Sequence, residues 1–502
     1  MTTLRSSLFA LLLCSTASAA FAQHFEQPSL PDSTTMVQIG TLATAGGGYY
    51  QPFWFTANRW GALSVEGHQP TFTVGVYGSP LDVGHGWKAN YGATLVTNRN
   101  LDNNVRALDA LLSVEKGLSR FAFGTRSHDT PLNDAELSTG AFALGRNATQ
   151  PLAISWQLPR WWRIGGEKSL FALRGHVAFG WLQDGGWQER RMAPVGGRFA
   201  TEVKYYEKSG YLRIGTDHSR WEFIGGLEMA NTFGGIIHHY NATPLKMPER
   251  PSDYLFAFIG KGGGDPTDGE GYANASGNTI GAWRAAITFR PKGDWQTRVY
   301  YDHYFEDDSQ AFDEYGWLDG LLGVQINFPR NRWVSKVVAE WLKMDYQSGP
   351  VYHDHTREIP DQVSGIDNYY NHGLYAGWQH YGMSMGNALF ASPLYDGNKS
   401  LMFAANRFRA QHVGIAGEPS AQLHYRLLYS HLKSWGTYAQ PFDEIQHQHS
   451  LLAEARWEGG AFSYNRLNGS CFATVAVGAD FGSRLGNRLG FMLGFGLKLF
   501  GK

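Results

Sequence analysis

The clearest pattern in the chain is an alternation of apolar with small or charged positions near the C-terminus. Large apolar side chains occupy every second position, namely Leu489, Phe491, Leu493, Phe495, Leu497 and Leu499. Apart from Met492, the positions between them hold small or charged residues: Gly490, Gly494, Gly496 and Lys498. Because side chains two apart on a strand share a face, the pattern predicts a β-strand with one wholly apolar face.

The segment before this strand repeats the alternation. Its apolar positions are Cys471, Ala473, Val475, Val477, Ala479 and Phe481, and the positions between them include Thr474, Gly478 and Asp480. Residues Ser483 to Arg488 supply a turn between the two segments. Together the segments predict a closing antiparallel hairpin.

Segments farther upstream have the same period of two. The apolar positions of four such runs are Trp87, Ala89, Tyr91, Ala93 and Leu95; Trp295, Val299 and Tyr301; Leu423, Tyr425, Leu427 and Tyr429; and Leu451, Ala453, Ala455 and Trp457. The runs are about ten residues long, the length that a tilted strand needs to cross a bilayer. Charged residues at the polar positions suit a wet lumen and not the core of a soluble β-sandwich or propeller. Aromatic residues gather near the ends of the runs, where a membrane interface would lie.

Composition argues against the roughly three soluble domains that a length of 502 residues would suggest. The chain has 61 glycines, 14% aromatic and 17% charged residues, whereas soluble proteins average about 25% charged residues. Its mean hydropathy of −0.33 is what strands with one apolar and one polar face average to. The aromatic content disfavours a disordered chain, and collagen is excluded because the glycines lack its every-third-residue repeat.

The N-terminus predicts export. Arg5 precedes the apolar stretch Leu8 to Leu13, and Ala20-Phe21-Ala22 is a small-x-small cleavage site, so residues 1–22 have the pattern of a signal peptide. No later apolar run approaches the roughly 18 residues of a membrane-spanning helix. We therefore expect residues 23–502 to form one domain, an all-β antiparallel transmembrane barrel of about 18 strands in the outer membrane.

Cysteine and loop patterns add detail to this expectation. Cys14 leaves with the signal peptide, so Cys471 cannot form an intramolecular disulfide and stability must come from a hydrogen-bonded framework. The segments Gly260 to Gly271 and Pro350 to Asp367 have the composition of long extracellular loops. Pro28 to Thr35 is a short irregular segment that we expect at the periplasmic mouth.

The sequence has no strong catalytic or metal-binding motif. His353-Asp354-His355, like the pair His447 and His449, lacks a third ligand at a recognisable spacing. The acidic run from Asp302 to Asp308 lacks the glycine and the bidentate glutamate of a calcium loop. Ser430 and His431 are adjacent, so on a strand they point to opposite faces. We expect no enzymatic activity, no catalytic residue, no metal site and no cofactor.

The charged residues at expected lumen positions are candidate ligand-binding groups. The arginines are Arg298, Arg407, Arg409, Arg426 and Arg456, and the acids that can face them are Asp302, Glu306, Glu454 and Asp480. One interpretation is an ion network that braces the barrel, and the other is a wall that contacts an acidic polymer. Expected exposed aromatics, which can stack on sugar rings or form an interfacial belt, are Tyr369, Tyr370 and Trp435.

Short segments in order along the chain resemble the capsule-assembly Wzi family of outer-membrane proteins. They are Pro52 to Gly61, Glu136 to Gly140 with Asn147-Ala148, Gly225 to Glu228 with Phe233 to Gly235, His303 to Asp307, Leu318 to Leu321, Asn368 to Asn371, Gly386 to Phe390, Asn406-Arg407 to His412, and Trp435 to Tyr438. The strongest matches are Asn368 to Asn371 and Gly386 to Phe390. The resemblance implies a barrel of about 18 strands that is plugged rather than an open pore.

The resemblance also implies a function. It implies a lectin-like protein at the surface of a Gram-negative cell that binds exported capsular polysaccharide and helps to assemble or attach the capsule. The expected partners are this or another surface polysaccharide, the lipid and lipopolysaccharide of the outer membrane, and the capsule export machinery, but no nucleic acid. The alternative function is a carbohydrate- or anion-selective porin, which the same charged lumen would serve.

Overall fold

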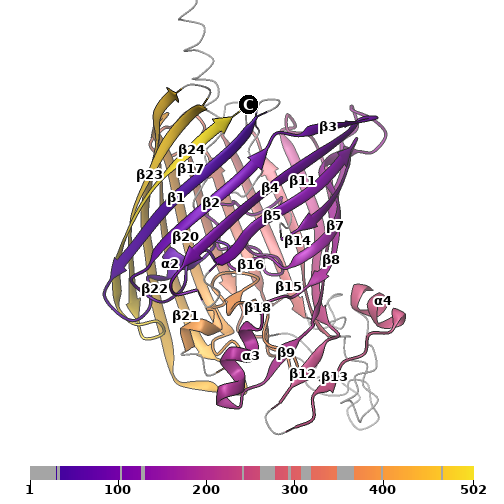
Figure 1. The fold of residues 1–502 in the computed structure, drawn as a ribbon, viewed down its shortest axis with the longest axis vertical. Helices are drawn as coiled ribbons and strands as arrows, with labels where there is room; N and C mark the ends of the chain where they lie inside the picture. The colour runs from indigo at the N-terminus through magenta and orange to yellow at the C-terminus, as the bar shows by residue number, and fades with distance from the viewer. Residues whose placement is uncertain are drawn as a thin grey trace, which may run out of the picture.

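The chain forms a closed antiparallel β-barrel, seen in a computed structural model (Figure 1). The structure describes residues 30, 34–101, 105–125, 131–239, 242–259, 277–291, 295–306, 318–347, 367–396, 400–464 and 467–501. Within them the main sheet has 19 strands, and one of these, the short β3 (Leu81–Gly84), pairs with β4 at the rim. The other eighteen form the wall, and β24 pairs with β1 to close it, which confirms the predicted fold.

The wall strands follow one another around the barrel in chain order. They are β1 (Thr35–Gly46), β2 (Pro70–Gly78), β4 (Trp87–Asn98), β5 (Val105–Lys116), β6 (Ser119–Gly124), β7 (Leu152–Arg163), β8 (Phe171–Trp181), β10 (Lys204–Ile214), β11 (Trp221–Phe233), β14 (Asn278–Phe289), β15 (Gln296–Glu306), β16 (Gly320–Asn327), β17 (Lys336–Lys343), β20 (Arg407–Ser420), β21 (Leu423–Gly436), β22 (Pro441–Tyr464), β23 (Leu467–Gly482) and β24 (Arg488–Gly501). Each neighbouring pair is antiparallel, so every connection turns back at one end of the barrel.

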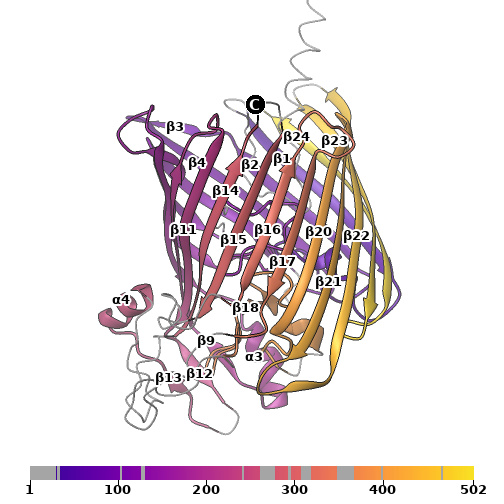
Figure 2. The ribbon, with the colours of Figure 1, turned by 180° about the vertical axis from the view of Figure 1, so that it is seen from behind.

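The two ends of the barrel differ. β1 starts and β24 ends at the same end, the upper one in Figure 1, and we call it the terminal end. Most of the connections there are short, whereas the long ones lie at the opposite end, the loop end, seen from behind in Figure 2. Outer-membrane barrels have short turns in the periplasm and long loops outside the cell. The loop end is therefore the extracellular end.

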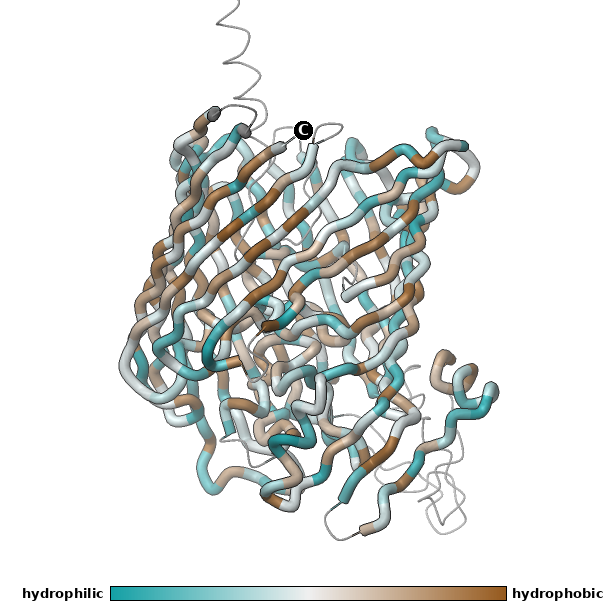
Figure 3. Tube along the Cα trace, viewed as in Figure 1, coloured by the Kyte–Doolittle hydropathy of each residue, from teal (hydrophilic) through white to brown (hydrophobic). Residues whose placement is uncertain are grey.

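The outer face of the wall is apolar, as the alternation predicts. On β24 the outward side chains Leu489, Phe491 and Leu493 are 50%, 56% and 67% exposed, whereas Gly490 and Met492 between them are buried. Figure 3 shows hydrophobic positions alternating with paler ones along the strands. The predicted hairpin forms in register, with Val475 opposite Leu493. A closed barrel with an apolar outer face is a protein of the outer membrane.

Three segments from the loop end fold into the lumen, and together we call them the plug: residues 47–69, residues 131–151, and residues 367–396 with 400–406. They contain α2 (Phe53–Thr56), the hairpin of β18 (Gln379–His380) and β19 (Met383–Ser384), and η3 (Pro393–Asp396). Large aromatic side chains of all three segments are at most 2% exposed and share one core: Trp54, Phe142, Trp378 and Phe390. The lumen is therefore filled by side chains, as the expectation of a plugged barrel requires.

The remaining elements lie at the loop end, below the wall in Figure 1. They are α3 (Trp187–Met192), η2 (Ala193–Val195), α4 (Pro251–Ile259) and a small sheet of β9 (Phe199–Thr201), β12 (Ile236–His238) and β13 (Leu245–Lys246). No helix in the described ranges is long and apolar enough to cross a membrane. The expected signal peptide, the expected loop from Gly260 to Gly271, most of the loop from Pro350 to Asp367 and His353 to His355 fall outside the described residues.

Candidate functional site

A buried carboxylate on the wall holds the second plug segment. Glu340 of β17 is 1% exposed and accepts hydrogen bonds from Ser138 Oγ at 2.6 Å and from the backbone N–H of Thr139 at 2.8 Å. Thr139 Oγ1 and the hydroxyl of Tyr300 on β15 donate to the same carboxylate at 2.7 and 2.6 Å. Because four donors from wall and plug converge on one acid, the plug is anchored rather than loosely inserted.

Two of the predicted lumen arginines also bind the plug. Arg298 donates from Nη1 to the carbonyl of Pro131 at 3.1 Å, and Arg426 donates from Nη1 to the carbonyl of Glu136 at 3.0 Å. Arg426 Nε also lies 2.9 Å from Glu454 Oε1, so this predicted ion pair forms. For these two side chains the geometry is that of a structural network that braces the barrel.

The other predicted partners pair differently. Arg298 lies 3.8 Å from Glu222, and Arg456 pairs with Glu458 two positions along its own strand. The acids have other partners: Asp302 pairs with Arg284 at 3.0 Å, Asp480 accepts from the Phe53 N–H at 2.9 Å, and Glu306 accepts from Tyr304 and from the Tyr370 N–H.

Placing Arg409 on the lumen side was wrong. Its side chain is 58% exposed on the outer face of β20, where it pairs with Asp345 at 2.7 Å. The inward positions of β20 are instead Phe408 and Ala410, both buried. Phe408 packs edge-on against Phe390 of the plug, with ring centroids 4.9 Å apart. An apolar side chain can face inward here because the plug, and not water, covers it.

The remaining predicted residues are Arg407 and Trp435, which lie near Arg409 at the loop end of the wall, and Tyr369 and Tyr370, which lie inside the plug. Arg407 stacks over the Tyr438 ring at 3.6 Å, and Trp435 lies within 5.8 Å of Arg409 and 5.2 Å of Lys433, as in an interfacial belt. The expectation that Tyr369 and Tyr370 are exposed was wrong, because both are 0% exposed. Tyr370 stacks on Phe390 at 3.9 Å, so its ring face is already covered.

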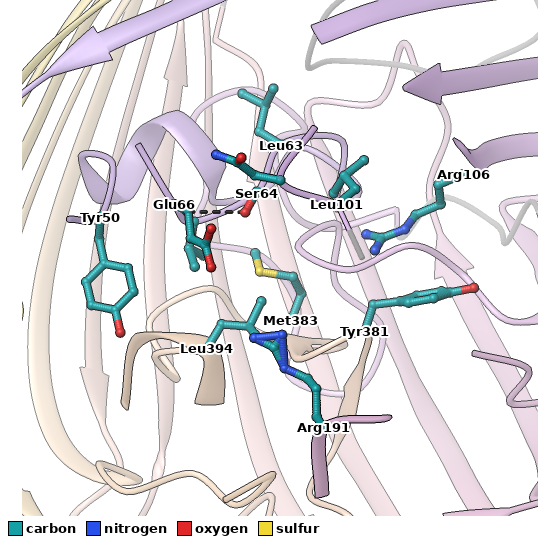
Figure 4. A pocket seen from close by; sticks show the side chains of 12 residues that line it. Tyr50, Leu63, Ser64, Glu66, Leu101, Arg106, Arg191, Tyr381, Met383 and Leu394 are labelled. Carbon is teal, nitrogen blue, oxygen red and sulfur yellow. Dashed lines mark hydrogen bonds between the residues drawn. The ribbon is translucent and has the colours of Figure 1, made fainter. Parts of the chain in front are cut away.

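An open cleft does exist at the loop end, between the plug and the rim (Figure 4). It encloses about 420 Å³ of space, including the part open to solvent. Four separate connections supply its walls, with residues 50 and 63–66, residues 100 and 101, residue 191, and residues 381, 383 and 394, together with Arg106 at the start of β5. Its polar lining includes Tyr50, Glu66, Arg106, Arg191 and Tyr381, and its apolar lining includes Leu63, Leu101, Met383 and Leu394.

Tyr381 occupies an unusual backbone position in this cleft. It and Gly382 form the two-residue turn between β18 and β19, with φ of 53° and 76°. A turn with two positive φ values favours Asn or Gly, and a bulky residue there is strained. The Arg106 guanidinium lies 4.0 Å from the centroid of the Tyr381 ring. Strained residues of this kind cluster at functional sites, where the surrounding structure holds them in place.

The cleft combines charges with aromatic faces. Arg106 is anchored by a hydrogen bond from Nη1 to the carbonyl of Gly61 at 3.1 Å, and Figure 4 shows Arg191 beside Leu394, below Met383. Glu66 accepts from the hydroxyl of the exposed Tyr49 at 3.2 Å, and this carboxylate raises the pKa of Tyr49. Guanidinium groups bind carboxylates in two-point contacts, and aromatic faces pack against sugar rings.

Sequence reasoning missed every residue of this cleft. One signal was present: Tyr381-Gly382 contains a glycine, the commonest turn residue, and an aromatic residue beside it in a turn is unusual. The grouping itself depends on four loops that are far apart in the chain. Among the described residues, no group of three or more histidine, cysteine, aspartate or glutamate side chains could hold a metal ion.

The fold and the filled lumen define a class, the closed outer-membrane barrels of eighteen strands. No protein-family model and no curated protein matches the chain. Among solved structures it is similar to Wzi of Escherichia coli, described as an outer membrane protein involved in group 1 capsule assembly and a carbohydrate-binding β-barrel. The TM-score is 0.52 at 11% identity, over 92% of this chain and 83% of Wzi.

Porins are also similar in structure. OccAB2 of Acinetobacter baumannii has a TM-score of 0.47 at 8% identity, over 94% of this chain and 99% of OccAB2. OprD of Pseudomonas aeruginosa has a TM-score of 0.44 at 9% identity, over 96% and 99% of the two chains. The likeness to Wzi, at a TM-score of 0.52 and 11% identity, shows the barrel fold, which confirms the predicted fold class. Membership of the Wzi family stays a prediction.

Proposed function

We propose that this protein binds an acidic polysaccharide at the loop-end cleft and holds capsule-type polymer at the cell surface, without catalysing a reaction. The observation that carries the proposal is the strained Tyr381 under the Arg106 guanidinium, presented at the extracellular end of a plugged barrel. A strained hairpin tip in contact with an arginine of the wall favours a binding role over a purely structural one.

The chemistry of the cleft fits the repeating unit of such a polymer. Arg191 and the buried Arg106 supply positive charge for a sugar carboxylate, and Tyr50 and Tyr381, which has Arg106 over one face of its ring, supply aromatic rings for the sugar. Glu66 can accept hydrogen bonds from sugar hydroxyl groups, which gives selectivity against a bare polyanion. The likeness to Wzi, a carbohydrate-binding β-barrel, supports the same function. The machinery that exports the polymer is then a partner of the loop end.

A second candidate function is a carbohydrate- or anion-selective porin. It is favoured by inward charged side chains that keep partial exposure: Arg290 and Arg298 at 20%, Glu458 at 25% and Lys336 at 28%. Such groups line a wet lumen that an ion could enter if the plug moved aside. The side chains that fill the core of the plug favour the polysaccharide-binding function over the porin function.

Deleting the gene in its bacterium tests the first candidate. We expect total polymer to stay constant, while polymer attached to cells falls and polymer in the medium rises. Complementation with wild-type protein or with Glu115→Gln, which changes an ion pair on the wall away from the cleft, should restore attachment. Complementation with Tyr381→Gly should not. Unchanged cell-attached polymer in the deletion strain would refute the proposal.

A further inference from the structure

Four cationic or titratable side chains form a row across the outer face of four neighbouring strands. Lys343 of β17 is paired with Arg409 of β20, Arg409 with Lys433 of β21, and Lys433 with His447 of β22. All four occupy the positions that alternate with buried residues, so they point away from the lumen. We call these four residues the cationic row.

The row lies at the boundary of the apolar belt. The next outward-facing residues toward the terminal end, two positions and about 7 Å along each strand, are Trp341, Gln411, His431 and His449. The outward-facing residues two positions farther along are Ala339, Val413, Tyr429 and Leu451, and they form part of the apolar belt. Trp341 is 48% exposed, and Trp435 lies beside Lys433, as expected of aromatic residues at a membrane interface. The row is therefore at the level of the outer-leaflet head groups.

The charge of the row is only partly balanced by the protein. Like charges directly opposite each other on neighbouring strands destabilise a sheet, yet Lys343, Arg409 and Lys433 are successive cross-strand partners. Asp345 is the carboxylate that pairs with them, at 2.7 Å from Arg409 and 3.9 Å from Lys343. One carboxylate against three cations leaves a net positive surface that faces the membrane.

Another outward lysine shows a different arrangement. Lys208 of β10 donates its Nζ to the carbonyl of Phe258 at the C-terminal end of α4, and its ammonium lies 4.3 Å from the Phe258 ring. The Lys208 ammonium is therefore bound by α4, through the carbonyl and the ring of Phe258. Arg409 is 58% and Lys343 is 41% exposed, so the row keeps room for an external anion.

We infer that the cationic row is a binding site for the phosphate groups of lipopolysaccharide in the outer leaflet. Phosphate is the anion that the lipid carries at this depth, and an arginine flanked by two lysines binds it through charge-assisted hydrogen bonds. The acyl chains of the same lipid lie against the apolar belt formed by Val413, Tyr429 and Leu451. This site is on the outer wall, separate from the loop-end cleft, and does not depend on the proposed polysaccharide function.

The test measures binding of purified lipopolysaccharide, intact or enzymatically dephosphorylated, to full-length protein in detergent by native mass spectrometry. The variant replaces Lys343, Arg409 and Lys433 by glutamine. The matched control replaces Lys88, Lys116 and Lys168, three exposed lysines in or beside the connections at the terminal end, by glutamine. Heat-modifiable electrophoretic mobility shows whether each protein is a folded barrel. If the triple variant does not fold, the single variant Arg409→Gln replaces it in the binding measurement.

We expect wild-type and control proteins to bind intact lipopolysaccharide at least about tenfold more tightly than the row variant. Dephosphorylated lipid should bind wild-type protein as weakly as intact lipid binds the variant. Binding of an acidic polysaccharide should be unchanged by the row variant, which separates this site from the cleft. Equal binding of intact lipid to variant and wild type, or of both lipids to wild type, would overturn the inference.

Discussion

Arg59 in the first plug segment forms a salt bridge with Glu454 of β22, although 395 residues separate them in the chain. Arg59 is 1% exposed, and Glu454 also pairs with Arg426 of the neighbouring strand. One wall carboxylate therefore balances a plug cation and a wall cation at once. Buried charges of this kind are stable only while the set is complete, because a lone buried charge has lost its hydration.

Replacing Glu454 by glutamine should be strongly destabilising. The change leaves Arg59 and Arg426 without their shared carboxylate, and breaking a buried pair costs about 3–5 kcal/mol. Guanidinium-induced unfolding of the detergent-solubilised protein measures the free energy of unfolding. The control is Glu115→Gln, because Glu115 and Arg120 are 23% and 30% exposed and such a pair contributes about 0–1 kcal/mol. Equal losses in the two variants would contradict the network.

The plug should keep the wild-type barrel nearly silent in a planar lipid bilayer. Replacing Glu340 by alanine removes the acceptor of four hydrogen bonds from Ser138, Thr139 and Tyr300, so openings should become frequent. Single-channel current at fixed voltage and salt is the measurement. A large steady current through the wild-type protein would instead favour the porin candidate.

The strained turn of the cleft predicts an order of stability between two variants. Tyr381→Gly and Tyr381→Ala both lose the stacking with Arg106, but only glycine adopts the positive φ of 53° without a steric penalty. The glycine variant should therefore have a free energy of unfolding about 1 kcal/mol greater than the alanine variant. An alanine variant of equal or greater stability would show that the turn is not strained.

Acid should weaken the attachment of the second plug segment. Burial raises the pKa of Glu136, but the ion pair with His424 at 3.0 Å and the charges of Lys336 and Arg426 outweigh it and lower the pKa to about 2. The unfolded value is about 4.3, so this carboxylate adds stability at every pH above that value. That contribution is lost as the pH falls from about 4.3 to about 2.

The comparison is between wild type and Glu136→Gln. Unfolding free energies at pH 5, 4 and 3 should fall more steeply for the wild type, because glutamine has no proton to bind. Lys336 keeps its partner Asp134 at 2.7 Å in both proteins, so the difference in slope isolates Glu136. Parallel slopes would contradict the prediction.

The wall could be predicted from the sequence because it depends on local periodicity. The hairpin that ends in Leu499 follows from alternation alone, and so does the inward position of Arg426. The inward Phe408 and the buried Tyr370 could not be predicted in this way, because both depend on a plug that returns to the wall from distant parts of the chain. The cleft around Tyr381 was hidden for the same reason, since its walls come from four connections.

The most direct test of the account is calorimetric titration of the purified protein with a uronic-acid polymer such as polygalacturonate. We expect saturable binding to wild type, an affinity at least about tenfold lower for Tyr381→Gly and for Arg106→Gln, and no binding of neutral dextran. The Glu115→Gln protein should bind as wild type does. Equal affinity of the two cleft variants and the wild type would contradict the assignment of the cleft, and so would the absence of any binding to wild type.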